Sequence, residues 1–256
     1  MMSERAHHID PEQTRVLITG ATSGVGEATA KLFAARGAAA VALLGRRPEE
    51  LSRVADEIGD HAHTFRADVS DSVSATDAVR AAVEELGGLD VVVNAAGIAR
   101  AASLEELDDR SWREVIDTNL SGTFYVSREA GLHMRAAGRG AIVNVASDLA
   151  TMGVAGLAHY SAAKAGVVGL SRALAIELAP TVRVNVVSPG PVDTPMLRGG
   201  LDASAPEASL REKEATVPLK RLAHPDEIAR AIWFLAIDGT FATGTSMALD
   251  GGTTAA

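Results

Sequence analysis

Short apolar runs alternate along this chain with segments in which apolar residues recur at helical spacing. The apolar runs cover residues 16–18, 40–44, 63–67, 89–93, 141–145, 182–187 and 246–249. Helical spacing predicts helices over residues 25–36, 48–58, 71–86, 107–134, 160–178 and 225–235, of which 107–134 holds one helix or two in series. Strands that are apolar on both faces and alternate with helices are typical of a parallel sheet covered on both sides. The pattern therefore predicts a single α/β domain with a doubly wound sheet of about seven strands.

Two stretches break this rhythm. Residues 1–13 are polar and lack the basic start and apolar core of a secretory signal, so we expect a flexible leader before a single domain over 14–256. Residues 191–218 are rich in Pro, Gly, Ala and charged residues. A loop of this length inside a compact domain is usually functional, so we expect 191–218 to form a substrate-binding loop or lid.

Composition narrows the function classes. The 256 residues include no cysteine, which excludes disulfides, thiolate catalysis and Cys-ligated metals and is compatible with a reducing cytoplasm. A formal net charge of −9 argues against a general nucleic-acid or anionic-membrane surface. No apolar run approaches the roughly 18 residues of a membrane span. We expect a cytoplasmic protein with a small-molecule partner, no nucleic-acid or membrane partner, and no metal site.

A glycine-rich turn joins the first strand to the first helix. Its residues Gly20, Thr22, Ser23, Gly24, Val25 and Gly26 lie where a backbone can approach a pyrophosphate closely. The following helix directs free N–H groups and its positive dipole end at that anion, so the turn predicts a dinucleotide site. A tight turn with no ligand is the alternative.

The end of the second strand bears on the choice of cofactor. Folds that prefer NAD place an acid there to bind the adenosine ribose, whereas this chain has Arg46 and Arg47. Because an arginine can form paired hydrogen bonds with a 2′-phosphate, the sequence favours NADP (NADPH), with NAD as the alternative. Two solvated arginines neutralised by Glu49 and Glu50 would also fit this pattern.

Tyr160 and Lys164 share one face of the helix predicted over 160–178 because residues i and i+4 are neighbours. A free tyrosine has a pKa near 10, and a nearby cation favours the phenolate and lowers that pKa. Such a tyrosine can exchange a proton with a carbonyl or hydroxyl oxygen while hydride moves. Ser147 follows a predicted strand, so its hydroxyl is expected at the same crevice, where it can polarise that oxygen. Taken singly, each of these residues is more typical of a surface group or a turn.

The ordered motifs together resemble the short-chain dehydrogenase/reductase family, in its compact single-domain branch of 3-oxoacyl-acyl carrier protein reductase-like enzymes with a Rossmann fold. The matching segments are TGATSGVG, Asp68-Val69, NAAG at 94–97, DTNLSG around Asn119, Ser147, YSAAK, NVVSPGPVDTPM and LDGG. They extend over essentially the whole chain. Four departures are Ala95, Ala146, Asp148 and the absence of a basic residue at Ser23. Ser23 weakens the case for NADP, and Asp148 is expected either to contact substrate or to lie in a solvated turn.

The resemblance implies a role for each matching residue. Tyr160 would be the general acid/base, Lys164 its pKa modifier and a ribose ligand, and Ser147 would steady the substrate oxygen. Asn119 would bend a helix and hold a water that relays protons to Lys164. The remaining cofactor contacts implied are Asp68, Val69, Asn94, Ala95, Gly97, Pro189, Gly190, Val192 and Thr194. Without the resemblance, Asp68 could equally be a helix cap and Asn94 a turn residue.

The predicted function is an NAD(P)-dependent ketoreductase or alcohol dehydrogenase, which transfers hydride between the nicotinamide and a ketone or secondary alcohol. A catalytically silent dinucleotide sensor or scaffold is one alternative, and a dehydratase or epimerase on the same fold is another. Residues Ala99, Arg100, Asp148, Met152, Val154 and Leu157 are expected to line the substrate pocket. The resemblance also implies a homotetramer or dimer, assembled through long helices such as the Ala-rich helix after Tyr160.

Overall fold

The computed structural model describes residues 9–255, in which seven parallel strands form one sheet in the order β3-β2-β1-β4-β5-β6-β7. This is the doubly wound sheet that the apolar runs predicted. The strands are β1 Arg15–Thr19, β2 Ala40–Gly45, β3 Ala62–Arg66, β4 Val91–Asn94, β5 Gly140–Val145, β6 Val182–Pro189 and β7 Ser246–Leu249. The order reverses between β1 and β4, and ligands of such sheets bind at that point, beyond the carboxyl ends of the strands.

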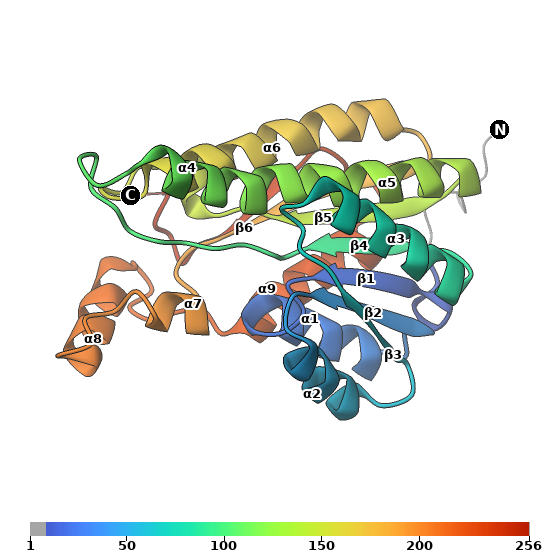
Figure 1. Ribbon diagram of the computed structural model, residues 1–256, viewed down its shortest axis with the longest axis horizontal. Coiled ribbons are helices and arrows are strands. Elements are labelled where there is room, and N and C mark those ends of the chain that lie inside the picture. Colours follow the sequence, from blue (N-terminus) through green and yellow to red (C-terminus); the bar gives the residue numbers. More distant parts are fainter. Residues whose placement is uncertain (1–8, 256) are drawn as a thin grey trace.

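Helices cover both faces of the sheet (Figure 1). The helices α1 Gly24–Ala35, α2 Pro48–Ile58 and α9 Pro225–Trp233 lie on one face. The other face carries α3 Ser72–Leu86, α5 Gly122–Ala137 and α6 Ala158–Leu178, with α4 Asp109–Ile116 packed against α6. Among the described residues, no helix has the length and hydropathy that crossing a bilayer requires.

Each face of the sheet has its own apolar core. Successive residues of a strand point to opposite faces, so Ile18 packs with Phe33 of α1 on one side while Leu17 packs with Met134 of α5 on the other. All four side chains are fully buried. Burial of one such side chain contributes about 1.5–3 kcal/mol, which accounts for the continuous apolar character of the central strands.

Two segments differ from the sequence-based expectation, and a third agrees with one of the two alternatives that were expected for it. Residues 1–8 of the predicted leader lie outside the described residues, whereas 9–13 fold onto the domain: Ile9 is buried and Pro11–Gln13 form a 3₁₀ turn, η2. Residues 191–218 contain two helices, α7 Pro195–Arg198 and α8 Pro206–Thr216, which project beyond the sheet in Figure 1. Residues 107–134 form α4 and α5, joined by a π-helical turn, η3 Asp117–Ser121.

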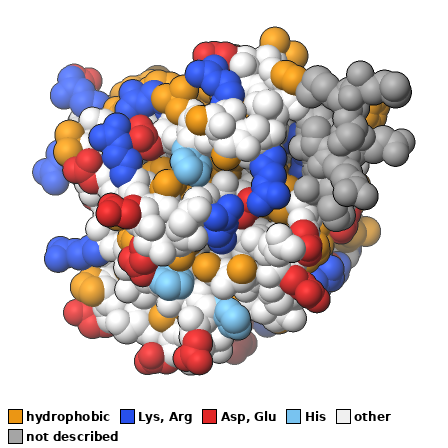
Figure 2. Space-filling view, turned by 90° about the vertical axis from the view of Figure 1, so that its right-hand side faces the viewer, with side chains coloured by type: hydrophobic (Ala, Val, Ile, Leu, Met, Phe, Trp, Pro, Cys, Tyr) orange, Lys and Arg blue, Asp and Glu red, His pale blue; other side chains and the backbone are white. Residues whose placement is uncertain are grey.

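The right-hand side of Figure 1 is the face opposite these projecting helices. Figure 2 shows that acidic and basic side chains are interspersed over this face. At the amino-terminal ends of the strands, the buried Asp90 carboxylate accepts hydrogen bonds from Arg15 Nε at 2.8 Å and Arg139 Nη2 at 2.8 Å. These bonds fasten together the starts of β1, β4 and β5.

Candidate active site

A cavity of about 940 Å³ opens at the carboxyl ends of the strands. It is lined by the phosphate-type loop after β1, the ends of β2 to β6, the start of α6 and the segment 189–218. Most of the residues predicted from the sequence lie together on this wall. They are Gly20, Thr22, Ser23, Gly24, Val25, Gly26, Arg46, Arg47, Asp68, Val69, Ala95, Gly97, Ser147, Tyr160, Lys164, Pro189, Gly190, Val192 and Thr194.

The loop after β1 requires glycine at two positions. Gly20 has a φ of +67°, and a Cβ there would lie 2.8 Å from the backbone of Ala96. A Cβ on Gly26 would lie 2.3 Å from the carbonyl oxygen of Gly20. The loop therefore folds back tightly on the start of α1, whose free N–H groups face the cavity. This glycine-lined cradle fits the pyrophosphate of a dinucleotide, which side chains would otherwise exclude.

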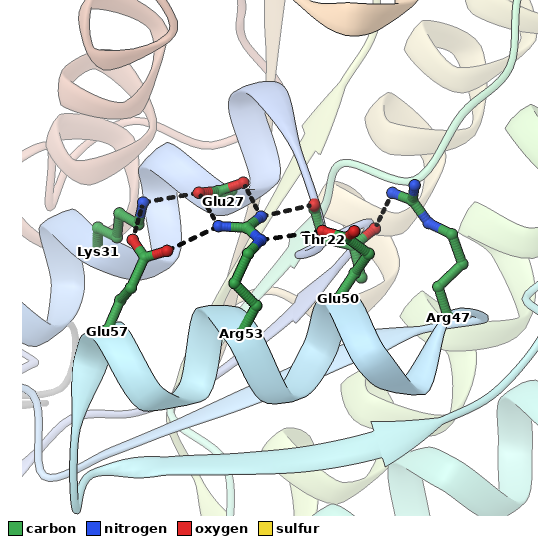
Figure 3. Close-up of polar contacts among 7 residues, drawn as sticks. All are labelled: Thr22, Glu27, Lys31, Arg47, Glu50, Arg53 and Glu57. Carbon is green, nitrogen blue, oxygen red and sulfur yellow. Dashed lines mark hydrogen bonds and ion pairs between the residues drawn. The ribbon is translucent and has the colours of Figure 1, made fainter.

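An ion-pair network between α1 and α2 supports the same loop (Figure 3). Arg53 on α2 donates to Glu27 at 2.9 Å and Glu57 at 2.8 Å, and its Nη2 lies 3.4 Å from the carbonyl oxygen of Thr22. Lys31 pairs with both Glu27 and Glu57. The spacing of Glu27–Lys31 and Arg53–Glu57 within each helix is visible in the sequence. The bonds between the two helices depend on the packing of α1 against α2 and could not be predicted.

The end of β2 carries no acid, because Gly45 and then Arg46 and Arg47 occupy this position. Arg47 donates to the Thr22 hydroxyl at 2.8 Å, and Arg46 lies 3.6 Å from the Asp68 carboxylate. Asp68 is not the cap of the following helix, since Asp71 caps α3. Arg46 and Arg47 both line the cavity.

Tyr160 and Lys164 lie one turn apart on α6, and both line the cavity. The Lys164 Nζ donates to the Val145 carbonyl oxygen at 2.8 Å and lies 5.6 Å from the centre of the Tyr160 ring. Burial lowers the pKa of the Lys164 ammonium to about 8. Burial also raises the pKa of the Tyr160 phenol to about 12; the Ser147 hydroxyl acts in the opposite direction and the Asp148 charge adds to the rise.

The net shift of the Tyr160 pKa is thus upward, opposite to the lowering that its spacing from Lys164 predicted. Removal of the phenol from water disfavours the phenolate, and this is the largest contribution to the shift. At neutral pH Tyr160 carries its proton and can act as an acid.

Ser147 follows β5 and caps a 3₁₀ turn, η4 Asp148–Ala150. Its hydroxyl donates to Asp148 Oδ1 at 2.8 Å and accepts from the Leu149 N–H at 3.2 Å. Asp148 is 5% exposed, so it is not the solvated turn residue that the sequence left open. The Thr253 hydroxyl donates to its second carboxylate oxygen, Oδ2, at 3.0 Å. Thr253, which also lines the cavity, was not predicted as a site residue and carries no motif of its own.

Two predicted residues, Asn94 and Asn119, lie behind the cavity wall. Asn119 is fully buried in η3, where its side chain accepts from the Ile98 N–H and donates to the Ile98 carbonyl oxygen, both at 2.8 Å. It thereby fixes the loop that contains Gly97, at which a Cβ would lie 3.1 Å from Asn119 Oδ1. Asn94 donates to Ser127 and Asn144 in the interior and ties β4 to β5 and α5.

The predicted pocket residues divide between two cavities. Ala99, Met152, Val154 and Leu157 line the main cavity, as does Asp148. Arg100 does not. It pairs with Glu114 on α4 and lines a separate cavity of about 480 Å³.

Comparison with known proteins adds a second line of observation. A family model described as enoyl-(acyl carrier protein) reductase matches residues 20–254. The chain is 44% identical to cis-4-hydroxycyclohexanecarboxylate dehydrogenase of Sinomonas cyclohexanicum, with 93% of this chain and 96% of the relative covered. It is 41% identical to D-threitol dehydrogenase of Mycolicibacterium smegmatis, with 93% and 92% covered. A 3-oxoacyl-[acyl-carrier-protein] reductase of Thermotoga maritima is 37% identical, with 92% and 96% covered.

Solved structures give the same result. Levodione reductase superposes with a TM-score of 0.91 at 33% identity, and 95% of this chain and 98% of that chain are covered. The aldohexose dehydrogenase of Thermoplasma acidophilum superposes with a TM-score of 0.88 at 30% identity, with 96% of both chains covered. All of these relatives are named as dehydrogenases or reductases, which favours oxidoreduction over a silent binding protein, a dehydratase or an epimerase.

Proposed function

Because this chain belongs to the short-chain dehydrogenase/reductase family, we propose that Tyr160 is the general acid/base of its reaction and that NADP is its preferred cofactor. The protein is an NAD(P)-dependent oxidoreductase that acts on alcohol and ketone groups of small molecules. The observation that carries the proposal is the convergence of Tyr160, Ser147 and Lys164 on the cavity that the glycine loop opens.

In the proposed mechanism, the glycine loop and α1 hold the pyrophosphate, and Lys164 with the segment from Pro189 to Thr194 holds the nicotinamide end. The bound cofactor supplies or accepts the hydride. Tyr160 gives its proton to the carbonyl oxygen during reduction and takes one from the hydroxyl during oxidation. Ser147 holds the same oxygen and stabilises the charge that develops on it.

The preference for NADP rests on the end of β2. No carboxylate stands there to accept hydrogen bonds from a ribose diol, and Arg46 and Arg47 both line that part of the cavity. The Arg46–Asp68 contact, at 3.6 Å between largely exposed groups, is worth about 0–1 kcal/mol. A doubly charged phosphate can therefore displace it at little cost.

A ketone screen with NADPH tests the catalytic assignment, with wild type compared to Tyr160→Phe. Loss of the phenolic proton should lower kcat by about 100-fold or more, in line with the usual contribution of general acid catalysis. Tyr125→Phe is a matched control, because Tyr125 is the other tyrosine of the chain and packs beside the core away from the cavity. Equal turnover by wild type and Tyr160→Phe would overturn the mechanism.

We also propose that the protein is cytoplasmic and assembles as a homotetramer or dimer. Along α6, the residues Ala162, Ala165, Gly169 and Ala173 form an exposed stripe of small side chains, next to Ile176, which is 81% exposed. Such a stripe permits close helix–helix contact. Light scattering should give two or four times the mass of the chain, and Ile176→Asp should lower that value.

A further inference from the structure

Asp148 is a buried carboxylate within the reaction cavity that the proton path from Tyr160 does not use. It lines the cavity together with Ser147 and Thr253, and only 5% of it is exposed. Its charge reaches the reacting groups, because it contributes to the rise in the pKa of the Tyr160 phenol. Burial of a carboxylate is costly unless hydrogen bonds satisfy it, so its partners show what it can still bind.

An ionised carboxylate offers about four lone pairs as acceptors. The hydroxyl of Ser147 and the N–H of Leu149 occupy Oδ1, at 2.8 and 2.9 Å. The Thr253 hydroxyl occupies one lone pair of Oδ2, at 3.0 Å. Within residues 9–255, no second donor reaches Oδ2. Asp148 lines the cavity and has one acceptor position that no described residue fills.

The bonds of Asp148 also fix what Ser147 can do. Because the Ser147 hydroxyl gives its hydrogen to Asp148, it has no hydrogen left to donate to a ligand in the cavity. Polarisation of a carbonyl oxygen requires Ser147 to turn that hydrogen towards the substrate. A substrate hydroxyl that donates to Oδ2 would keep the number of donors on the carboxylate at three when Ser147 turns away from Oδ1, so the Ser147 hydrogen could bind the carbonyl oxygen.

The rest of this part of the wall is apolar. Met152, Val154 and Leu157 line it near Asp148, with Met196 and Leu197 of α7 also facing the cavity. Such side chains fit a hydrocarbon ring or chain and form no hydrogen bonds with hydroxyl groups. The ligand that complements both parts has an apolar body and one donor beside the reacting carbon.

We propose that Asp148 is a substrate-binding residue that selects vicinal diols and the matching α-hydroxyketones, with the second hydroxyl donating to Oδ2. In reduction of the α-hydroxyketone, the carbonyl carbon would gain hydride from the reduced NAD(P)H, and the carbonyl oxygen would gain the proton of Tyr160, which leaves the phenolate. The C–O bond of the neighbouring hydroxyl stays intact throughout, so the product is the vicinal diol. This inference rests on the proposed role of Tyr160 in the same cavity.

Calorimetry on the full-length protein saturated with NADPH, with which alcohols cannot react, tests the proposal, with cyclohexanol and 1,2-cyclohexanediol (cis and trans) as probes. A hydrogen bond to a charged group should make one diol bind about tenfold or more tightly than the monoalcohol. Asp148→Asn should reduce this preference at least fivefold and leave the affinity for cyclohexanol nearly unchanged. Asp148→Ala should have the same effect on the ratio, and thermal unfolding reports whether each variant is folded.

Asp56→Asn is the matched control, because Asp56 is an exposed carboxylate on α2 that does not line the cavity. It should leave the preference for the diol unchanged. A parallel kinetic test measures kcat/KM for 2-hydroxycyclohexanone and for cyclohexanone with NADPH. Asp148→Asn should lower the ratio of these two values, as it lowers the preference in binding. The proposal would be overturned if wild type bound the diol and the monoalcohol equally well or bound neither. It would also be overturned if Asp148→Asn kept the wild-type ratio of diol affinity to monoalcohol affinity. Failure of the proposed function gives a different result, since Tyr160→Phe would then turn over ketones as fast as wild type.

Discussion

Replacement of Arg46 by alanine is the sharpest test of the cofactor preference. The Arg46 guanidinium lies at the end of β2, lines the cavity and has Asp68 as its nearest charged partner at 3.6 Å. The substitution removes one positive charge from the ribose end and leaves the Asp68 carboxylate without its cation. Both changes weaken the binding of a negatively charged 2′-phosphate. A 2′-hydroxyl is neutral, so its binding should change little.

The size of the effect follows from exposure. A hydrogen bond to a charged group contributes about 1.5–3 kcal/mol when well shielded. The Arg46 side chain is 62% exposed, so solvent screening reduces this contribution to about 1–1.5 kcal/mol. The affinity for NADPH should therefore fall roughly 5- to 12-fold, and the affinity for NADH should stay within about twofold. Arg47→Ala should weaken NADPH binding less, because the Arg47 guanidinium already donates to the Thr22 hydroxyl.

Fluorescence titration of both reduced cofactors into wild type and Arg46→Ala measures these constants. Arg80→Ala is the control for net charge, because Arg80 pairs with Glu129 on the surface between α3 and α5 and does not line the cavity. Tighter binding of NADH than NADPH by wild type would refute the assignment. An equal loss of both cofactors in Arg46→Ala would show that Arg46 serves the fold of the loop rather than the phosphate.

Two further predictions concern buried charges. Lys164 has a folded-state pKa of about 8, below its unfolded value of about 10.4. Between these pH values the unfolded chain therefore binds more protons than the folded chain. The free energy of unfolding should rise by up to about 3 kcal/mol from pH 8 to above pH 10. Urea unfolding at a series of pH values should show this rise in wild type and not in Lys164→Met. If the free energy of unfolding changed with pH equally in both proteins, the prediction would be contradicted. Asp90→Asn should lower the free energy of unfolding by about 1–3 kcal/mol at pH 7. Because the pKa of Asp90 lies below its ordinary value of about 4, this difference should disappear as the pH falls below 4, and a loss independent of pH would point to packing instead.

The strands could be predicted closely because their signal is local. Residues such as Val41 and Val92 are buried because helices cover both faces of the sheet. A strand that is buried on both faces has an uninterrupted run of apolar residues, which is visible in the sequence. The helix α8 has no comparable apolar pattern. It has no buried residue, so no apolar stripe marks it in the sequence, and residues 191–218 were predicted as a loop. The apolar pattern does not reveal the π-helical turn η3 either, since the pattern continues through it; only the family resemblance implied a bend there, at Asn119.

The residues of the site that come directly after a strand could be predicted, because the carboxyl ends of the strands determine where these residues lie. Gly20, Ser147 and Gly190 follow β1, β5 or β6, and all of them reach the cavity. Contacts between distant segments leave no pattern in the sequence. The Thr253 hydroxyl meets Asp148 across 105 positions, and Asn119 meets Ile98 across 21. Only the folded chain distinguishes these partners from the many other polar residues at similar positions.

The protonation of Tyr160 shows the same limit in energetic terms. The i, i+4 spacing places Lys164 beside Tyr160, and this is all that the sequence can establish about their interaction. Whether the ammonium stabilises a phenolate depends on how much water each group loses and on where the ammonium hydrogen bonds are directed. In this fold, burial disfavours the charged form of both groups, and Lys164 is held by the Val145 carbonyl oxygen. The pair therefore stands at neutral pH with the proton on Tyr160, which is the form that a carbonyl substrate requires.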